Sequence, residues 1–345
     1  MARSSIRNIG LLSAMLAGMF VPAALAQSLD KATPSDRLTI IVGYPPGAAY
    51  DVYARALSRH MGKHLAGSPA ITVQNMPGAG SLAAANFLYN TAPKDGFVIG
   101  MFSRGVAVQP LFDPDGVRFD PLKFNWIGSP SSDVSFALAW HLSPVKTFQD
   151  MTSKEMTMAA SGPGADATVF PNVLNAMLGT RIKIVTGYQG AADSLLAIER
   201  GEVDGTAGIS WSTLASSRPE WLHNGKVSFL IQLATRGRDD LKDVPLVTSL
   251  AKTDADRRVL ELIFSRQTMA YPFVAPPGVA PARVDALRRA FNETISDAAY
   301  IDEAKRLGMS VNLVTGQEIQ EIITQAFLAP PEIIEKARAA IATPR

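Results

Sequence analysis

A glycine-rich turn, Asn-Met-Pro-Gly-Ala-Gly-Ser at residues 75–81, stands between an apolar strand pattern and an alanine-rich helical pattern. Gly78, Gly80 and Ala83 match the relaxed spacing G-x-G-x-x-G/A, with which a strand–helix turn binds the pyrophosphate of a dinucleotide. That site also needs an acid about 20 residues later for the ribose. Here the next strand ends in Arg104, without an acid. The turn therefore predicts binding of a smaller anion, such as a carboxylate.

Three more turns rich in Gly, Pro and Ala lie at residues 44–51, 161–168 and 187–193, each between a strand pattern and a helical pattern. In parallel α/β sheets such turns lie at the carboxyl ends of the strands, where ligands bind. A helix start presents unpaired N–H groups and a partial positive charge of about +0.5. One such turn is explained equally well by close strand–helix packing, but four together predict a cleft for an anion.

Few other side chains near these turns could recognise a ligand. Arg104 could pair with a ligand carboxylate, with a structural salt bridge or a solvated side chain as an equal alternative. Asp166 and Asp204 could accept a hydrogen bond from a ligand hydroxyl or amine, although Asp166 also suits the first turn of a helix. Tyr44 and Tyr188 flank the turns and could line the cleft or pack in the core.

The sequence offers little for catalysis. There is no cysteine, and residues 101–105 and 208–212 each miss the nucleophile motif G-x-S-x-G by one position. His60 and His64 lie one helical turn apart, as metal ligands can, but no third ligand accompanies them. We therefore expect no catalytic residue, no metal and no cofactor, and we expect that the protein is not an enzyme.

Two series of elements must position these turns. Apolar runs alternate with helical patterns twice, which predicts two α/β lobes, each a mostly parallel sheet flanked by helices. The segment 124–151, rich in Ser, Pro and Asp, is expected to be the crossover, with the return at 234–245 and the following helices packed on the first lobe. Strands are expected near 38–45, 70–75, 97–103, 156–160, 182–187, 203–210, 226–234 and 268–278, and helices near 50–65, 81–90, 166–178, 190–200, 281–296, 298–307 and 316–328.

The chain begins with the features of a leader. Arg3 and Arg7 precede an apolar stretch that ends in Ala-Leu-Ala, which predicts a secretory signal peptide at residues 1–26. Without it the formal charge falls from +2 to about 0, so no basic surface for nucleic acid is expected. Lobe 1 is expected at 27–127 plus 241–345, and lobe 2 at 128–240. With no cysteine, these features predict a periplasmic protein, and a monomer is the default for this architecture.

Four segments together resemble a known family: "IIVGYPPGAAYDVYARAL", "VQNMPGAGSLAAANFLYNTAPKDGFVIG", "GYQGAADSLLAIERGEVDG" and "FVAPPGVAPARVDALRRAFNETISD". Over nearly all of residues 37–340 the chain resembles the solute receptors of tripartite tricarboxylate transporters, the Bug-type periplasmic receptors. The resemblance implies a two-lobed periplasmic binding protein of the Venus-flytrap, type II-like class. Such a receptor closes on a small organic acid and docks on membrane permease subunits. A signalling receptor is the alternative, and a periplasmic hydrolase is a more remote one.

The resemblance also implies where the ligand lies. In the family the first two strand–helix turns hold a ligand carboxylate through backbone N–H groups and ordered water, and the turns of the second lobe set selectivity for the far end. With the side chains named above, the candidate ligand-binding residues are Tyr44, Gly47, Ala48, Ala49, Gly78, Ala79, Gly80, Ser81, Arg104, Ser161, Gly162, Gly164, Asp166, Tyr188, Gln189, Gly190 and Asp204.

Two departures from the family pattern change the expected ligand. The first turn is usually richer in glycine, and Ala48 and Ala49 disfavour the positive φ that glycine allows. Asp166 places an acid in a second-lobe turn, where it would repel a second ligand carboxylate or pair with an amine. The expected ligand is therefore a monocarboxylate, an aromatic acid, or an acid with a neutral or cationic far end, rather than a tricarboxylate.

Overall fold

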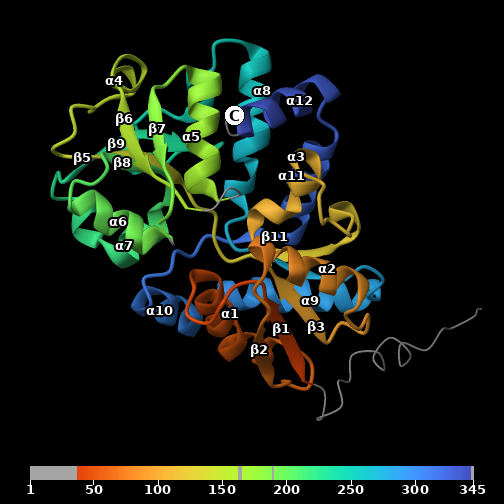
Figure 1. Ribbon diagram of the computed structural model, residues 1–345. Coiled ribbons are helices and arrows are strands. Elements are labelled where there is room, and N and C mark those ends of the chain that lie inside the picture. The colour runs from red at the N-terminus through yellow and green to blue at the C-terminus, as the bar shows by residue number, and fades with distance from the viewer. Residues whose placement is uncertain (1–36, 162–164, 189, 343–345) are drawn as a thin grey trace, which may run out of the picture.

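The computed structural model describes residues 37–161, 165–188 and 190–342, which form two lobes (Figure 1). The signal peptide expected at residues 1–26 lies outside the described residues. Each lobe contains one sheet that packs against helices on both faces. The expected two-lobed α/β fold is confirmed, although both sheets are mixed rather than parallel throughout.

The first sheet has six strands in the order β11-β4-β10-β3-β1-β2, numbered along the chain. These strands are β1 (Leu38–Val42), β2 (Ile71–Asn75), β3 (Val98–Met101), β4 (Asn125–Ser129), β10 (Phe273–Ala275) and β11 (Val314–Thr315). The first three are parallel, whereas β10 and β11 run antiparallel to their neighbours. The strand β1 reads Leu-Thr-Ile-Ile-Val and is buried at all but one position, as a central parallel strand requires.

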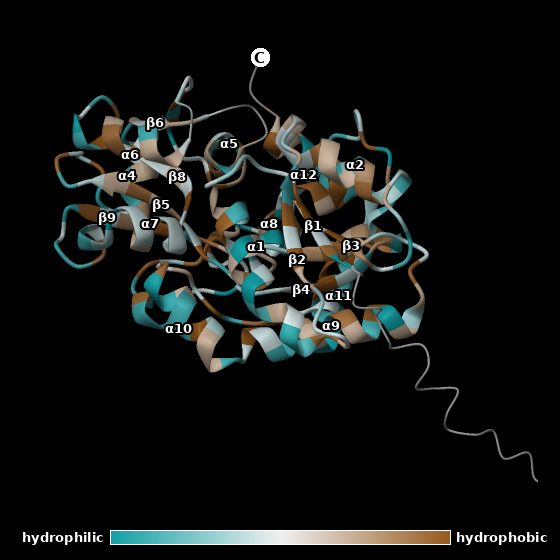
Figure 2. Ribbon diagram, turned by 90° about the horizontal axis from the view of Figure 1, so that it is seen from below, coloured by the Kyte–Doolittle hydropathy of each residue, from teal (hydrophilic) through white to brown (hydrophobic). Residues whose placement is uncertain are grey.

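Helices cover both faces of the first sheet. They are α1 (Ala49–His60), α2 (Leu82–Asn90), α9 (Pro281–Ile295), α10 (Ala298–Arg306) and α11 (Gly316–Phe327). One face packs with α1, α9 and α10 around Leu57, Phe273 and Phe291. The other packs with α2 and α11 around Phe102 and Trp126. Figure 2 shows hydrophobic residues on β1, β3 and β4 in the interior and many hydrophilic residues on α10.

The second sheet has five strands in the order β7-β6-β8-β5-β9. They are β5 (Ser135–Trp140), β6 (Met156–Ala159), β7 (Ile182–Val185), β8 (Gly205–Ser210) and β9 (Val227–Leu233). Its nearby helices are α4 (Phe148–Ser153), α5 (Asp166–Leu178), α6 (Ala191–Glu199) and α7 (Trp211–Ser217). The helix α5 packs on one face, and α6 and α7 pack on the other. The two sheets share one arrangement. Three parallel strands, β2-β1-β3 in the first sheet and β7-β6-β8 in the second, are followed by an antiparallel strand that enters from the other lobe, β10 or β5.

The chain passes between the sheets at two segments, 130–134 and 265–272, which lie side by side. Asp133 N–H donates to Gln267 O, and Ala270 N–H donates to Ser131 O, each at 3.1 Å. These two crossing segments connect β4 to β5 and α8 (Asp254–Phe264) to β10.

The first observed crossing, 130–134, lies inside the expected segment 124–151 but is much shorter, and the second lies at 265–272 instead of the expected 234–245. The segment 124–151 contains β4 and β5, because its apolar runs form buried strands in spite of the Ser, Pro and Asp residues between them. The segment 234–245 turns back along β9, where Gln232 N–H donates to Pro245 O at 2.9 Å. The chain therefore stays with the second sheet beyond the expected return.

The C-terminal helices also divide between the lobes. We expected all of them on the first lobe, and α9, α10 and α11 pack there. In contrast, α8 and α12 (Pro331–Ile341) lie beside α5 in Figure 1 and share one hydrophobic cluster with it. Each presents an apolar stripe, which includes Leu260 in α8 and Ile333 in α12, to the buried face of α5. In the described part of the chain, no helix is long and apolar enough to span a bilayer.

Candidate functional site

The first turn of the site, between β1 and α1, is fixed by the carboxylate of Asp51. Its Oδ2 accepts from Gly47 N–H at 2.9 Å and from Arg55 Nε at 2.8 Å, and its Oδ1 accepts from Asn75 Nδ2 at 2.8 Å. Asn75 Nδ2 also donates to Tyr44 O at 2.9 Å, which connects this turn to the end of β2. Burial alone would raise the pKa of Asp51, but these hydrogen bonds outweigh it and lower the pKa to about 2. Asp51 therefore acts as a structural anion.

The alanines of the first turn do not need a positive φ. Ala48 is the N-cap of α1, with φ −67° and ψ 158°, and Ala49 is the first residue of the helix. In the turn between β1 and α1, Gly47 is the residue with a positive φ, at 82°. Because glycine occupies the position that requires it, the two alanines fit without strain.

The second turn, between β2 and α2, has a positive φ at four consecutive residues: Gly78 (149°), Ala79 (46°), Gly80 (64°) and Ser81 (84°). Ala79 and Ser81 are strained, because a Cβ atom disfavours this conformation. Ser81 is buried, and its Oγ donates to Gly43 O at 3.0 Å. The first turn of α2 carries no acidic side chain. An anion at this helix start would therefore meet no negative charge from α2 itself.

Arg104 and Asp166 connect the two lobes in an ion-pair cluster that is mostly shielded from water. Arg104 follows β3 in the first lobe, and its Nη2 donates to Asp166 Oδ2 at 2.8 Å. Arg266, in the second crossing segment (265–272), donates from Nη2 to Asp166 Oδ1 at 2.8 Å. The side chains of Arg104, Asp166 and Arg266 are 12%, 23% and 8% exposed, so this contact lies largely out of water. The three groups carry one net positive charge.

Burial and ion pairing act in opposite directions on these groups. Burial would raise the pKa of Asp166, but Arg266 and Arg104 outweigh it and hold that pKa below its usual range. Burial would lower the pKa of Arg104, but Asp166 reverses this and the pKa is raised. Burial does lower the pKa of Arg266, although an arginine starts so high that it stays charged. The cluster is therefore ionised at neutral pH.

A second buried acid lies near the cluster, in the first crossing segment. Asp133 is 7% exposed, and its Oδ2 accepts a hydrogen bond from Ser212 at the start of α7. Its Oδ1 accepts from Val134 N–H at 2.9 Å. Desolvation raises the pKa of Asp133, and the hydrogen bond from Ser212 and the charge of Arg104 oppose this only in part. As pH falls, Asp133 is therefore protonated at a higher pH than an exposed aspartate.

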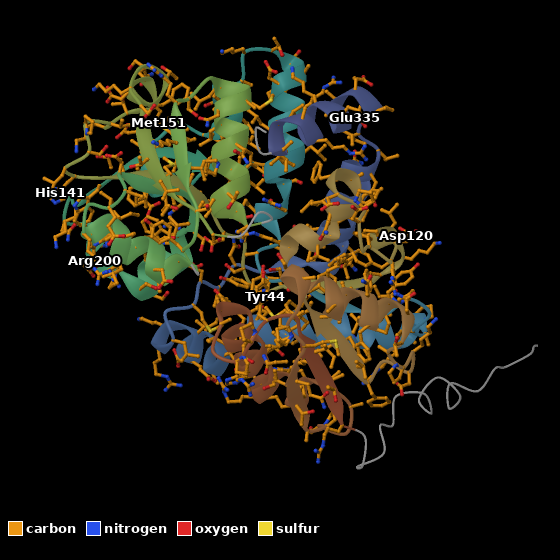
Figure 3. All side chains as sticks on the ribbon, in the orientation of Figure 1. Tyr44, Asp120, His141, Met151, Arg200 and Glu335 are labelled. Carbon is orange, nitrogen blue, oxygen red and sulfur yellow. The ribbon has the colours of Figure 1, made fainter. Side chains whose placement is uncertain are left out.

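Tyrosines line the first-lobe side of the cluster. The rings of Tyr44 and Tyr50 stack with 4.4 Å between centroids, and Tyr271 packs edge-on to Tyr50 at 5.0 Å. Tyr50 Oη accepts from Arg104 N–H at 3.3 Å and donates to Ala270 O at 3.1 Å. Tyr44 is partly exposed, and Figure 3 places it on the side of the first lobe that faces the second. Tyr44 therefore stays a candidate for contact with a ligand.

A small cavity of about 160 Å³ lies at the starts of α5 and α6 in the second lobe. Its described lining consists of Ser, Thr, Ala, Gly and Ile residues, including Ser161 and Gly190. Gly208 of β8 belongs to the lining, and a Cβ atom there would lie 2.7 Å from the carbonyl carbon of Asp166. The cavity is therefore uncharged and adjoins the ion-pair cluster.

A larger cavity of about 1400 Å³ lies on another side of the crossing segments, between residues 234–240 and α11. Side chains of both signs line it, among them Arg238, Asp240 and Glu318. The residues that line it include none of the predicted ligand-binding residues. We therefore place the candidate site at the strand ends and not in this larger cavity.

The structure gathers most of the described candidates at the carboxyl ends of β1, β2, β3, β6 and β7, where the lobes face each other. Asp204 is not among them: at the start of β8, its Oδ2 accepts from Thr157 N–H and Oγ1, each at 2.8 Å. Tyr188 is partly buried against the cluster around Leu195. Three candidates, Gly162, Gly164 and Gln189, lie outside the described residues.

Sequence reasoning missed several residues of the site, above all Arg266, Gln267 and Tyr271. All three belong to the second crossing segment, 265–272, whereas the sequence pattern placed the return crossing at 234–245. The signal that could have found them is the strongly amphipathic helix α8, since the chain must leave it through residues 265–272 to reach β10. Asn75 was also missed, and a single asparagine at a strand end gives no distinctive pattern.

The described residues of the candidate site offer groups that could bind an anion. Among the described residues, no three His, Cys, Asp or Glu side chains are grouped to hold a metal ion. The two histidines one turn apart each face a carboxylate instead: His60 Nε2 lies 2.6 Å from Glu303, and His64 Nε2 lies 3.2 Å from Asp297. Helix starts, small residues and a net positive cluster provide a place for an anion.

Comparison with protein families gives one match over most of the chain. Residues 53–338 match the family described as tripartite tricarboxylate transporter family receptor. The chain is also 25% identical over 333 residues to the UPF0065 protein in the gbd 5′ region of Cupriavidus necator, with 94% of each chain covered.

Solved structures of similar fold agree with this match. A TctC solute binding protein from Polaromonas has a TM-score of 0.66 at 18% identity, over 88% of this chain and 100% of that one. Rpa4515 of R. palustris, solved with adipate, has a TM-score of 0.64 at 16% identity, over 88% and 98% of the two chains. At these identities the likeness shows a shared fold, that of solute-binding proteins.

Proposed function

Because the chain belongs to the receptor family of tripartite tricarboxylate transporters, we propose that it captures a small organic carboxylate between its two lobes. In this proposal the protein acts in the periplasm after removal of residues 1–26. It delivers the ligand, as a monomer, to the permease subunits of a tripartite tricarboxylate-type transporter. It binds and releases the ligand without changing it, so it is not an enzyme.

The observation that carries the proposal is the positive charge where the lobes face each other. The cluster of Arg104, Arg266 and Asp166 has one excess positive charge and lies mostly out of water. The start of α2, with no acidic side chain in its first turn, lies in the same lobe as Arg104. A buried charge without a counter-ion is costly, so an anionic ligand stabilises this arrangement. The adipate in Rpa4515 is consistent with a carboxylate as that anion.

Closure follows from the position of the cluster. Arg104 belongs to the first lobe, Asp166 to the second and Arg266 to the segment that joins them. A ligand that contacts both lobes shifts the population toward the closed form, because only that form provides all of its contacts. The permease would then recognise the closed receptor.

A thermal-shift screen of residues 27–345 tests the proposal. The panel contains aliphatic monocarboxylates and dicarboxylates, citrate, aromatic acids, amino acids and NAD. A ligand at about 100 times its dissociation constant adds about 2.7 kcal/mol to the free energy of unfolding, a rise of several degrees in Tm. We expect at least one carboxylate to produce this rise.

Matched variants show whether the rise comes from the site. Arg104→Gln removes the excess positive charge, so the ligand-induced rise in Tm should shrink or vanish. Arg200→Gln removes the same charge from an arginine at the outer edge of the second lobe, labelled in Figure 3, and should leave the rise unchanged. A rise with NAD alone, or none with any acid, would count against a carboxylate receptor. Mass spectrometry of the denatured protein checks for a ligand retained through purification.

A further inference from the structure

We propose that the cleft takes a ligand with one carboxylate and an uncharged far end, and that Asp166 sets this specificity. The inference rests on the proposed function, because it requires a carboxylate in the cleft. It depends on the difference between two kinds of positive group among the described residues: those already paired with an acid, and those left for a ligand.

In the described part of the second lobe, the two helix starts at the site are each paired with an acid. These two helices, α5 and α6, each carry an acid in the first turn, Asp166 and Asp193. An acid at this position interacts favourably with the positive end of the helix. The cavity of about 160 Å³ beside these helix starts has only uncharged residues in its described lining. Such a cavity suits a small apolar group, a hydroxyl or an amide.

Asp166 also occupies the two arginines that could otherwise take a second carboxylate. Arg104 and Arg266 each donate from Nη2 to a different oxygen of the same Asp166 carboxylate, both at 2.8 Å. A second ligand carboxylate would need this same position. The acid therefore acts through the arginines it occupies, and not as the unpaired repulsive charge that its place in the sequence suggested.

The count of charges gives the same answer. Arg104, Arg266 and Asp166 together carry one positive charge. Any charge on the nearby Asp133 can only reduce it, so the site neutralises at most one ligand carboxylate. A second carboxylate would bury a net negative charge, which is costly out of water. In the first lobe, α1 has Asp51 in its first turn, already hydrogen-bonded to Arg55, whereas α2 has no acid there. The single carboxylate therefore belongs at the turn before α2.

Two glycines lie close to members of the ion pair, one to the Arg266 side chain and one to the Asp166 backbone. A Cβ atom at Gly105 would lie 3.2 Å from Arg266 Nη1, and one at Gly208 would lie 2.7 Å from the carbonyl carbon of Asp166. Backbone therefore packs closely on both partners of the ion pair. This close packing leaves little space for the Asp166 backbone or the Arg266 side chain to shift toward these glycines.

Isothermal calorimetry with matched ligands tests the inference. The probes are the dicarboxylates from succinate to suberate, terephthalate, and the monoamide of each, which keeps the shape and removes one charge. The wild-type protein should bind the best monoamide about tenfold or more tightly than its dicarboxylate, as expected for one charge-assisted contact. In Asp166→Asn both arginines lose their counter-ion, so this ratio should fall by about tenfold or more, or reverse.

Asp254→Asn is the matched control. Asp254 is the first residue of α8, as Asp166 is of α5, but its side chain is 87% exposed. This variant should keep the wild-type ratio. A wild-type protein that binds any dicarboxylate more tightly than its monoamide, or that binds no monoamide, overturns the inference even if Asp166→Asn does not fold. An unchanged ratio in Asp166→Asn overturns it too. Failure of the proposed function is distinct, because then no acid in the wider panel raises Tm.

Discussion

Asp51 illustrates how one buried side chain can decide the shape of a turn, here the one between β1 and α1. It is 2% exposed, and its two oxygens accept hydrogen bonds from Gly47, Arg55 and Asn75. These partners favour the ionised form so strongly that the pKa falls from 3.8 to about 2. Because the folded state lowers this pKa, the ionised carboxylate stabilises the fold at every pH above its unfolded value.

Replacing Asp51 with Asn should therefore destabilise the protein in a pH-dependent way. At neutral pH we expect a loss of about 2 kcal/mol in the free energy of unfolding, from the size of the pKa shift. The difference from the wild type should shrink as pH falls from about 4 to about 2, since the wild-type carboxylate becomes protonated there. Urea denaturation across this pH range measures it. Asp285→Asn, at an exposed acid, serves as control, and a difference that stays constant with pH would contradict the argument.

At the residue scale, the sequence predicted which residues lie at the candidate site better than it predicted which residues they contact. The four small-residue turns and Arg104 could be found because glycine patterns and a lone cation after a strand are local signals. The partner Arg266 lies 100 residues from Asp166 in the chain, and the sequence around each residue gives no signal of the contact. Asp204 was misplaced for a related reason: an acid before a strand looks the same whether it faces a ligand or, as here, Thr157.

At the scale of elements, the site depends on how closely β8 approaches the start of α5. Gly208 has φ 101°, and its Cα faces the backbone of Asp166 and Ala167. A Cβ atom would come within 2.7 Å of that backbone, which has no flexible end to move away. The strand thus fixes the height of the helix start, and with it the position of the Asp166 carboxylate.

Gly208→Ala should be more harmful than its small size suggests. We expect a cost of about 1–3 kcal/mol from overpacking, in addition to about 1 kcal/mol for the unfavourable φ. Gly201→Ala is the control: Gly201 has φ 71° but nothing within 4 Å of an added Cβ, so it reports the cost of φ alone. Chemical denaturation compares the two variants. Equal losses would show that β8 and α5 are not in close contact in solution.

The elements predicted correctly from the sequence were those with a clear hydrophobic periodicity or with an adjoining turn of small residues. The strands β1 to β3 and β6 to β8 and the helices α9 to α11 lie where the pattern placed them, within a few residues. The strands β4 and β5 were read as a crossover, because Ser, Pro and Asp between them suggested a loop. Short strands that complete a mixed sheet gain stability from tertiary pairing, which local composition does not report.

At the scale of the whole molecule, the lobes share more than the crossing segments. One hydrophobic cluster contains Phe170 of α5, Leu260 of α8 and Ala337 of α12, and it extends to Leu111 in the short helix α3 (Gln109–Phe112) after β3. In α12, Arg338 Nε donates to Leu111 O at 2.6 Å. The chain pattern predicted two lobes but could not predict this shared core, because an apolar stripe on a helix does not specify its partner.

The shared cluster predicts that the lobes lose stability together. Leu260 is fully buried in it, so Leu260→Ala should cost about 2–5 kcal/mol through lost burial and the cavity left behind. Native-state hydrogen exchange should show equal losses of protection in β1, in the first sheet, and in β6, in the second. If the lobes were joined only at 130–134 and 265–272, the loss would be confined to β6 and its helices. Equal losses would mean that α8 and α12 join the lobes into one cooperative unit, so that the Arg104–Asp166 contact is held by the core as well as by its charges.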